Sequence, residues 1–199
     1  MSFSLRWVLI AGLATLSGAA TAQAPDQSAA MKEMQDRMKA VATLGPRHAD
    51  LANFIGKWDV ELAMIMPGAP TTRSKATADY SWVIEGRWLG QRITGQFMGG
   101  PFESFSIIGY DNFAKNHVVA SVSSLDTSML MSRGLVVDPS HRVTAVYGTL
   151  DEYTTNELHK PYKAVTRKID DNRHVMEVWD LGIGDAGAKV LEYTFTRRK

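Results

Sequence analysis

The sequence predicts an all-β protein, an antiparallel up-and-down β-barrel of about ten strands with a short N-terminal helix. From Gly56 onwards, hydrophobic and polar residues alternate with a period of two, which is typical of strands with one buried face. Turn residues recur roughly every 14 residues, and such short connections favour antiparallel neighbours. An open sheet of this size has two exposed edges, so closure into a barrel is favoured over the alternative, a two-sheet sandwich.

Residues 1–22 have the features of a secretory signal peptide. Arg6 stands in a short head, an apolar run follows, and small residues in an Ala-x-Ala pattern end at Ala22. A cut after Ala24 would place Pro25 directly behind it, so cleavage after Ala22 is expected. The apolar run is short against the ~20 residues that span a bilayer. We therefore expect a periplasmic or secreted protein with no stable membrane anchor after processing.

The length, charge and cysteine content of the chain exclude several classes of protein and of functional site. The chain has 199 residues, 45% of them hydrophobic, which suits one domain with a sizeable core. Cleavage removes one arginine and leaves 21 basic against 21 acidic residues, so no charge stripe points to nucleic acid. The absence of cysteine excludes disulfides, thiol nucleophiles and thiolate metal sites. We predict a linker and helix over residues 23–44 and the barrel domain over 45–199.

An amphipathic helix precedes the barrel. Met31, Met34, Met38 and Val41 recur at spacings of three and four, and Gly45-Pro46 ends the pattern. This helix could cap the open end of the barrel, the interpretation we prefer, or form a partner-binding face, since methionines adapt to many surfaces. A short helical turn over residues 48–54 leads into the first strand.

The bounds of each predicted strand follow from the alternation of hydrophobic and polar residues and from the turn residues that end it. Pro67-Gly68-Ala69-Pro70 ends the first, Glu85-Gly86 forms a hairpin, and Gly99-Gly100-Pro101 breaks the chain again. Later turns fall at Asp138-Pro139-Ser140 and Asp170-Asp171-Asn172. The predicted strands are 58–64, 76–84, 87–97, 102–110, 117–123, 129–137, 142–150, 162–169, 174–181 and 189–198.

The first and last strands resemble those of the calycin superfamily of lipocalins and fatty-acid-binding proteins. Gly56-Lys57-Trp58 follows a helical turn, and Arg197 shares a face with apolar residues of the last strand. The resemblance implies that Gly56, Trp58 and Arg197 close one end of the barrel, with Arg197 over the Trp58 ring in a cation–π contact worth about 0.5–2 kcal/mol. Any ligand is then expected to enter at the opposite end.

Four stretches in the same order resemble a single bacterial family, the domain-of-unknown-function family 1579, which is grouped with the calycins. They are GPRHADLANFIGKW, the Gly86-Arg87-Trp88-Leu89 hairpin, PFESFSIIGYDN and the ending LEYTFTR. The resemblance covers roughly residues 31–199. The stretch Ser121–Asp126 lacks a tryptophan expected there. The family implies a fold and no agreed reaction.

The histidines do not form a catalytic or metal-binding pattern. The five histidines share no spacing that gathers metal ligands, and no Gly-x-Ser-x-Gly motif is present. We therefore predict no metal and no cofactor. His48 could stand at a pocket mouth or act as a haem-type ligand, but a local bond to backbone at the helix start is favoured. Ser104 and Ser106 are expected to face solvent.

Mid-strand charges and aromatic residues supply the candidate ligand site. Glu103 or Glu177 could point inward and pair with Arg92 or Arg167; alternatively these charges face water, which is favoured for Glu103. A ten-stranded barrel is wide enough to leave an interior space, which aromatic side chains would line. The predicted ligand-binding residues are Tyr80, Trp82, Arg92, Phe105, Arg167, Glu177, Trp179 and Tyr193.

Three functions remain open from the sequence. The preferred one is a periplasmic barrel that binds a small hydrophobic or amphipathic molecule in its interior. The alternatives are a cofactor-free acid–base enzyme that uses Glu177 or a nearby tyrosine on a hydrophobic substrate, and a packed barrel that serves as an interaction module, possibly as a homodimer.

Overall fold

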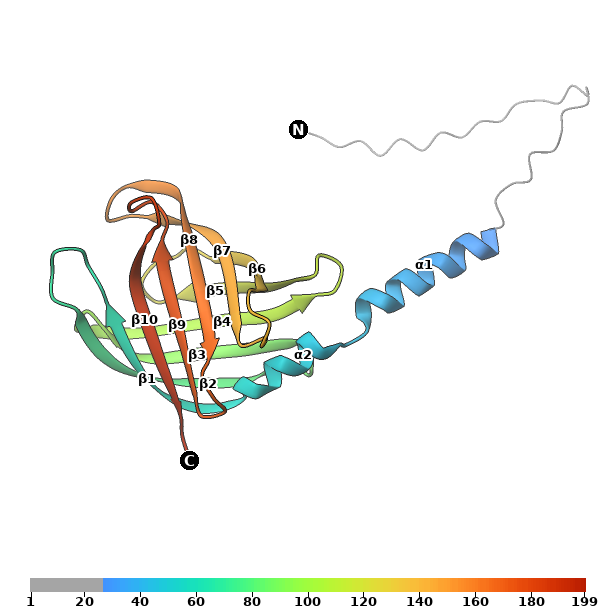
Figure 1. Cartoon of the computed structure of the whole chain (residues 1–199), viewed down its shortest axis with the longest axis horizontal. Coiled ribbons are helices and arrows are strands. Elements are labelled where there is room, and N and C mark those ends of the chain that lie inside the picture. The colour runs from blue at the N-terminus through green and yellow to red at the C-terminus, as the bar shows by residue number, and fades with distance from the viewer. Residues whose placement is uncertain (1–26) are drawn as a thin grey trace, which may run out of the picture. The chain divides into compact units, whose positions relative to one another are not determined.

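The structure, a computed structural model, describes residues 27–199; the predicted signal peptide lies outside them. Ten antiparallel strands form a closed barrel in which each strand pairs with its neighbours in sequence and β1 pairs with β10 (Figure 1). The predicted fold class is confirmed. The strands are β1 Gly56–Met64, β2 Thr72–Ile84, β3 Trp88–Phe97, β4 Gly100–Asp111, β5 Asn116–Ser123, β6 Leu130–Val136, β7 Val143–Glu152, β8 Glu157–Lys168, β9 Arg173–Asp180 and β10 Ala188–Arg197.

The helices lie before β1 in the chain: α1 is Gln27–Ala42, α2 is Pro46–Leu51, and a 3₁₀ turn, η1, is Ala52–Phe54. α1 starts before Met31, so the helix is longer than its apolar pattern, and Met31, Met34 and Met38 are exposed. In the part of the chain that the structure describes, no helix is long and apolar enough to cross a membrane.

Two loop side chains of the barrel bind the last carbonyls of α1, which have no partner inside the helix. Asn112 donates to the carbonyl of Val41 at 3.0 Å, and Arg87 donates to that of Ala42 at 2.8 Å. These bonds fix the segment that leads into α2.

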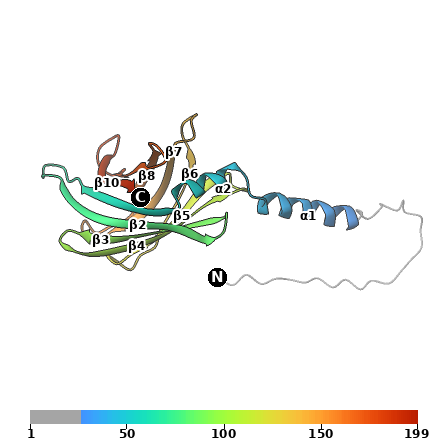
Figure 2. The same cartoon turned by 90° about the horizontal axis from the view of Figure 1, so that it is seen from below.

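α2 lies at the end of the barrel where β1 begins, which we call the α2 end (Figure 2). Pro46 occupies its first turn, where the missing N–H is not needed. The Nδ1 atom of His48 accepts a hydrogen bond from the backbone N–H of Gly45 at 3.1 Å, and this buried ring packs edge-on against Tyr110 at 5.7 Å. His48 thus takes the local backbone role favoured from the sequence.

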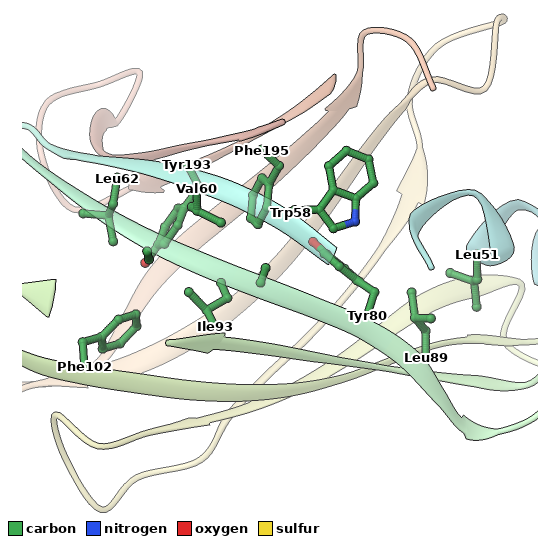
Figure 3. Close-up of a cluster of buried hydrophobic side chains, with 12 residues drawn as sticks. Leu51, Trp58, Val60, Leu62, Tyr80, Leu89, Ile93, Phe102, Tyr193 and Phe195 are labelled. Carbon is green, nitrogen blue, oxygen red and sulfur yellow. The ribbon is translucent and has the colours of Figure 1, made fainter. Parts of the chain in front are cut away.

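A hydrophobic core lies on the inner face of β1, β2, β3 and β10. Trp58, Leu62, Leu89 and Phe195 are almost completely buried, and Leu51 from α2 packs against the same cluster (Figure 3). At about 25 cal/mol per Å² of apolar area, burying each such side chain contributes roughly 1.5–3 kcal/mol. This packing holds the first and last strands together and closes the barrel.

The guanidinium of Arg197 closes the α2 end from the last strand. It lies 4.1 Å from the centre of the Trp58 ring, and the two residues are direct partners in the β1–β10 register. Its nitrogens donate to the carbonyls of Ile55, Asn53 and Asp171 at 2.6–2.8 Å. The indole N–H of Trp58 donates to the Phe54 carbonyl at 2.8 Å. Side chains of the first and last strands, β1 and β10, therefore both hold the η1 turn in place.

Candidate functional site

The barrel encloses a cavity of about 630 Å³, which is within the range of small-molecule sites. Exposed residues line it at both ends: His141 and Arg142 at the α2 end, and Leu125 and Asp126 at the opposite, far end. The cavity therefore extends to the end that Trp58 and Arg197 close as well as to the far end. Ligand passage through the far end stays a prediction.

One wall of this cavity is apolar. Inward-facing residues of β9 and β10 supply Met176, Val178, Leu191 and Tyr193. Burial raises the pKa of the Tyr193 phenol to about 12, so this residue is a neutral phenol at physiological pH. The wall offers dispersion contacts and apolar area to a ligand.

Hydroxyl groups line the opposite wall. β4 and β5 stand five strands away from β9 and β10 around the ring of ten, hence across the cavity. Ser104 pairs with Ser123 and Ser106 with Ser121 in the β4–β5 register, and all four line the cavity. We call them the hydroxyl patch. The Oγ atoms of Ser106 and Ser121 are hydrogen-bonded at 2.8 Å.

The hydroxyl patch corrects a sequence-based expectation. Ser104 and Ser106 were expected to face solvent, but they point inward, and Ser106 is buried. Their neighbours Glu103 and Phe105 point outward instead. A cavity that a polar ligand or water can fill tolerates inward serines, whereas a core packed solid would not.

A buried polar chain crosses the interior at the α2 end. The Gln91 amide donates to the hydroxyl of Tyr80, and that hydroxyl lies 3.1 Å from Nε2 of His174. The His174 ring stacks on Phe195 with centroids 4.1 Å apart and meets the Trp58 ring edge-on at 4.6 Å. Burial, aided by the nearby Arg197 charge, lowers the pKa of His174 to about 3, so its ring is neutral. Burial also raises the pKa of Tyr80 above its ordinary value.

His117 presents a second neutral imidazole, near the start of β5. It is 6% exposed, lines the cavity, and packs edge-on against Tyr110 at 5.1 Å. Its Nε2 atom is buried and has no hydrogen-bond partner. Burial, reinforced by the charge of Arg47, lowers the pKa of His117. Buried polar atoms without partners are uncommon, and this one lies at a cavity wall.

The structure brings two of the eight predicted ligand-binding residues to the cavity, Tyr80 and Tyr193. Trp82 points inward beside Leu89 and packs against the core without lining the cavity. The other five are outside, in contacts on the outer face of the barrel. Those five are Arg92, Phe105, Arg167, Glu177 and Trp179.

The outward charges form surface contacts. Arg92 pairs with the exposed Glu103 and lies over the Phe105 ring at 5.2 Å. Glu177 lies 3.3 Å from the Lys189 ammonium and 3.8 Å from Arg167. Glu103 therefore faces water, as favoured from the sequence, and the inward alternative for Glu177 is wrong. The same holds for the Glu177 version of the acid–base enzyme, because this carboxylate does not face the cavity.

The error at Glu177 lies in which face of β9 was taken as the inner one. Glu177 shares a face with Val175 and Trp179, as predicted, but that face is the outer one, and β9 runs in unbroken register with β8. β10 carries a β-bulge opposite: Lys189 pairs with Trp179, but Leu191 pairs with Val178, so the register slips by one residue at Val190.

The residues that sequence reasoning missed are the inward polar ones, above all His117, His174 and the hydroxyl patch. A signal for His174 does exist: it alternates in phase with Met176 and Val178, opposite to Glu177. That signal is weak because Val175 and Trp179 make the outer face of β9 just as apolar. Among the described residues, no group of three or more His, Cys, Asp or Glu side chains could hold a metal ion.

Comparison with known proteins places the chain in a family. The crystal structure of Rv2717c from M. tuberculosis matches with a TM-score of 0.53 at 13% identity, covering 79% of this chain and 100% of that one. A redesigned β-barrel matches with a TM-score of 0.40 at 12% identity, covering 77% and 96%. The search of curated proteins gave no match. The family model described as "Protein of unknown function (DUF1579)" matches residues 43–197, and the chain therefore belongs to the DUF1579 family.

Proposed function

We propose that this protein binds a small amphipathic molecule inside its barrel, in the periplasm. The observation that carries the proposal is the cavity of about 630 Å³ with two unlike walls. Met176, Val178 and Leu191 would contact the apolar body of the ligand, and the hydroxyl patch would bind its polar groups. The resemblance of the chain ends to calycins, whose barrels hold ligands, supports the same assignment.

The wall chemistry favours an amphipathic ligand over a purely apolar one. A hydrocarbon against the hydroxyl patch would displace water without replacing its hydrogen bonds, at a cost of about 1–3 kcal/mol for each hydroxyl left without a partner. Ser106 and Ser121 already bond to one another, yet each hydroxyl can form further hydrogen bonds. A molecule with polar atoms along one side satisfies both walls.

Binding of a fluorescent probe tests the proposal. N-phenyl-1-naphthylamine, whose emission rises in apolar sites, should bind the processed protein in a saturable way at one site. Ser121→Trp fills the cavity from its wall and should abolish the signal. Ala120→Trp, one residue along the same strand and on the outer face, is the matched control and should leave it unchanged. Absence of saturable binding to the wild type, or equal binding by both variants, would contradict the proposal.

The periplasmic location rests on the leader sequence alone and has its own test. Expression of the full chain in a bacterial host should release a soluble product into the periplasmic fraction, with Gln23 as its first residue. A product that stays in the cytoplasm with an intact leader would refute this location while leaving interior binding open.

A further inference from the structure

We propose that a row of neutral polar side chains on one wall of the cavity selects the ligand by binding a hydroxyl or carboxamide group at its polar end. The row consists of successive cross-strand partners on β2, β3, β4 and β5 that all line the cavity: Tyr80, Gln91, Ser106 and Ser121. We call it the polar row. The inference rests on the proposed interior binding and specifies the class of ligand.

The register of the barrel brings these side chains together. Direct partners on one face of an antiparallel pair have Cβ atoms about 4.5–5.5 Å apart. Hydrogen bonds close the first and last steps along the row: the Gln91 amide donates to the Tyr80 hydroxyl, and the Oγ atoms of Ser106 and Ser121 lie 2.8 Å apart. No hydrogen bond joins the described side chains of Gln91 and Ser106, although they too are direct partners. A ligand group would bind at this middle step.

The carbonyl oxygen of the Gln91 amide is an open acceptor there. The Gln91 side chain is buried, and within residues 27–199 its only hydrogen bond is the one that its nitrogen donates to Tyr80. Buried polar side-chain atoms that are both fully covered and without a partner occur, in the same range, only on Asn116, His117, His174 and Trp179. The Oε1 atom of Gln91 therefore keeps accessible surface, and this surface faces the cavity that Gln91 lines.

A group that both donates and accepts completes the polar row. The Gln91 oxygen needs a donor, whereas the serine pair also has a hydrogen to give, because its internal bond uses only one of two hydroxyl hydrogens. A ligand hydroxyl or carboxamide does both with one group. The match does not depend on which end of the Gln91 amide faces the cavity, because a hydroxyl also accepts from an amide NH₂.

An ionic head group is disfavoured at the polar row because it would find no counter-charge there. Among the described residues that line the cavity, the carboxylates and the lysine and arginine cations are Asp50, Asp126, Arg142 and Lys168. They lie in α2, in two loops and at the last residue of β8, whereas the polar row lies within strands. Lys168 already pairs with Asp171 at 2.8 Å. Moving an unpaired charge from water to an uncharged wall costs far more than moving a hydroxyl that gains hydrogen bonds.

The polar row and the apolar wall together orient the ligand. β4 and β5 stand across the cavity from β9 and β10, which supply Met176, Val178 and Leu191. The polar group would lie between Gln91 and Ser106, and the apolar body would extend along β9 and β10. A fatty alcohol, a monoacylglycerol or a fatty amide has this form. A fatty acid, ionised near neutral pH, carries a charge and lacks the donor.

Decyl probes with different head groups test the inference. Decanol donates and accepts, decyl methyl ether only accepts, and decanoate is an anion. Displacement of N-phenyl-1-naphthylamine gives their dissociation constants, and decanol should bind more tightly than decanoate. The ratio of the ether constant to the alcohol constant should be about tenfold higher in the wild type than in Gln91→Met, the size of one buried hydrogen bond. Comparing this ratio between variants cancels the different hydrophobicity of the two probes.

Matched variants separate the polar row from the rest of the barrel. Gln91→Met removes the amide and keeps the length of the side chain, and Gln96→Met, the same change at an exposed position of β3, should keep the wild-type ratio. Ser106→Ala should weaken decanol binding about tenfold relative to N-phenyl-1-naphthylamine, and Ser81→Ala, at an exposed position of β2, is its control. Binding of N-phenyl-1-naphthylamine shows that a variant is folded, and if Gln91→Met fails this check, Ser106→Ala decides.

The outcomes distinguish this inference from the proposed function. An equal ratio in wild type and folded Gln91→Met, or decanol binding that Ser106→Ala leaves unchanged, would overturn the role of the polar row while interior binding stands. Tighter binding of decanoate than of decanol would overturn the neutral class of ligand. Failure of the wild type to bind N-phenyl-1-naphthylamine or any decyl probe would overturn both.

Discussion

The hydroxyl of Tyr80 lies 3.1 Å from Nε2 of His174, and this pair joins β2 to β9 across the interior of the barrel. Gln91 donates to the same hydroxyl from β3. With that donor in place, the Tyr80 hydrogen can point to His174 and keep its ring neutral. Three strands that are not all neighbours are thus linked by side chains inside the barrel, at the end that Trp58 closes.

The His174 imidazole should make the protein sensitive to acid. Its folded pKa of about 3 is below the ordinary 6.5, so the unfolded chain binds more protons between these values. This contribution is fully present above pH 6.5 and is lost as pH falls towards 3. Between about pH 6.5 and 5 it should cost the wild type roughly 1.5–2 kcal/mol of unfolding free energy.

Urea unfolding at a series of pH values measures this loss. His174→Gln, which does not titrate, should flatten the pH dependence by that amount. His159→Gln, at an exposed site, is the control and should keep the wild-type slope. The window above pH 5 avoids Asp138 and Asp171, whose pKa values are lowered from 3.8 by hydrogen bonds from Ser140 and Lys168. Equal slopes in wild type and His174→Gln would show that His174 is not the titrating group.

Trp58→Ala should destabilise the barrel without changing its ligand preference. It removes a ring that is 1% exposed from the core and leaves a cavity, at a cost of about 3–5 kcal/mol. Chemical denaturation measures the loss, and the affinity for N-phenyl-1-naphthylamine should stay at its wild-type value in the folded variant. A stable variant that no longer binds ligand would reverse this assignment and place the site at Trp58.

Arg197→Met should also destabilise, by roughly 2–4 kcal/mol, because it leaves three backbone carbonyls without their donor. Arg197→Lys is the matched variant. A lysine keeps the charge over Trp58 but has no planar fork to reach all three carbonyls, so an intermediate loss is expected. If lysine restored full stability, the cation–π contact rather than the carbonyl network would be the main contribution.

Gly109 and Trp88 should be energetically coupled on the outer face. A Cβ atom at Gly109 would lie 2.4 Å from the Trp88 ring, which covers the glycine across the β3–β4 pair. Gly109→Ala should therefore destabilise, and Trp88→Ala should relieve the clash. A double-mutant cycle is expected to give a coupling of at least about 1 kcal/mol. Additive effects of the two changes would mean that the ring moves aside freely.

Glu177→Gln should change stability by less than about 1 kcal/mol, because the charge pairs with Lys189 and Arg167 at the outer surface. Probe affinities should stay at wild-type values, since the side chain does not line the cavity. Loss of probe binding in this variant would return Glu177 to the interior and refute the β9–β10 register with its bulge at Val190.

The strands and the closure of the barrel could be predicted from the sequence because each depends on patterns within a short segment. Alternation along β1 and β10 and the shared face of Trp58 and Arg197 are patterns of period two, and a closed barrel leaves no other place for the apolar face. The inner wall was harder to predict because β9 is apolar on both faces. There, only the pairing of β9 with β8 and β10 shows that His174 and not Glu177 faces the cavity.

The sequence by itself therefore determined the number and order of the strands, their closure and the residues that seal one end, because hydrophobic periodicity and turns are properties of short segments. Only the tertiary structure decided which polar side chains enter the barrel. His174 on β9 is far along the chain from His117 and the hydroxyl patch on β4 and β5, and their convergence depends on the register around the whole ring. Strand pairing sets that register, and a strand such as β9, apolar on both faces, does not reveal it locally, so the contents of the cavity are fixed by pairing and not by composition.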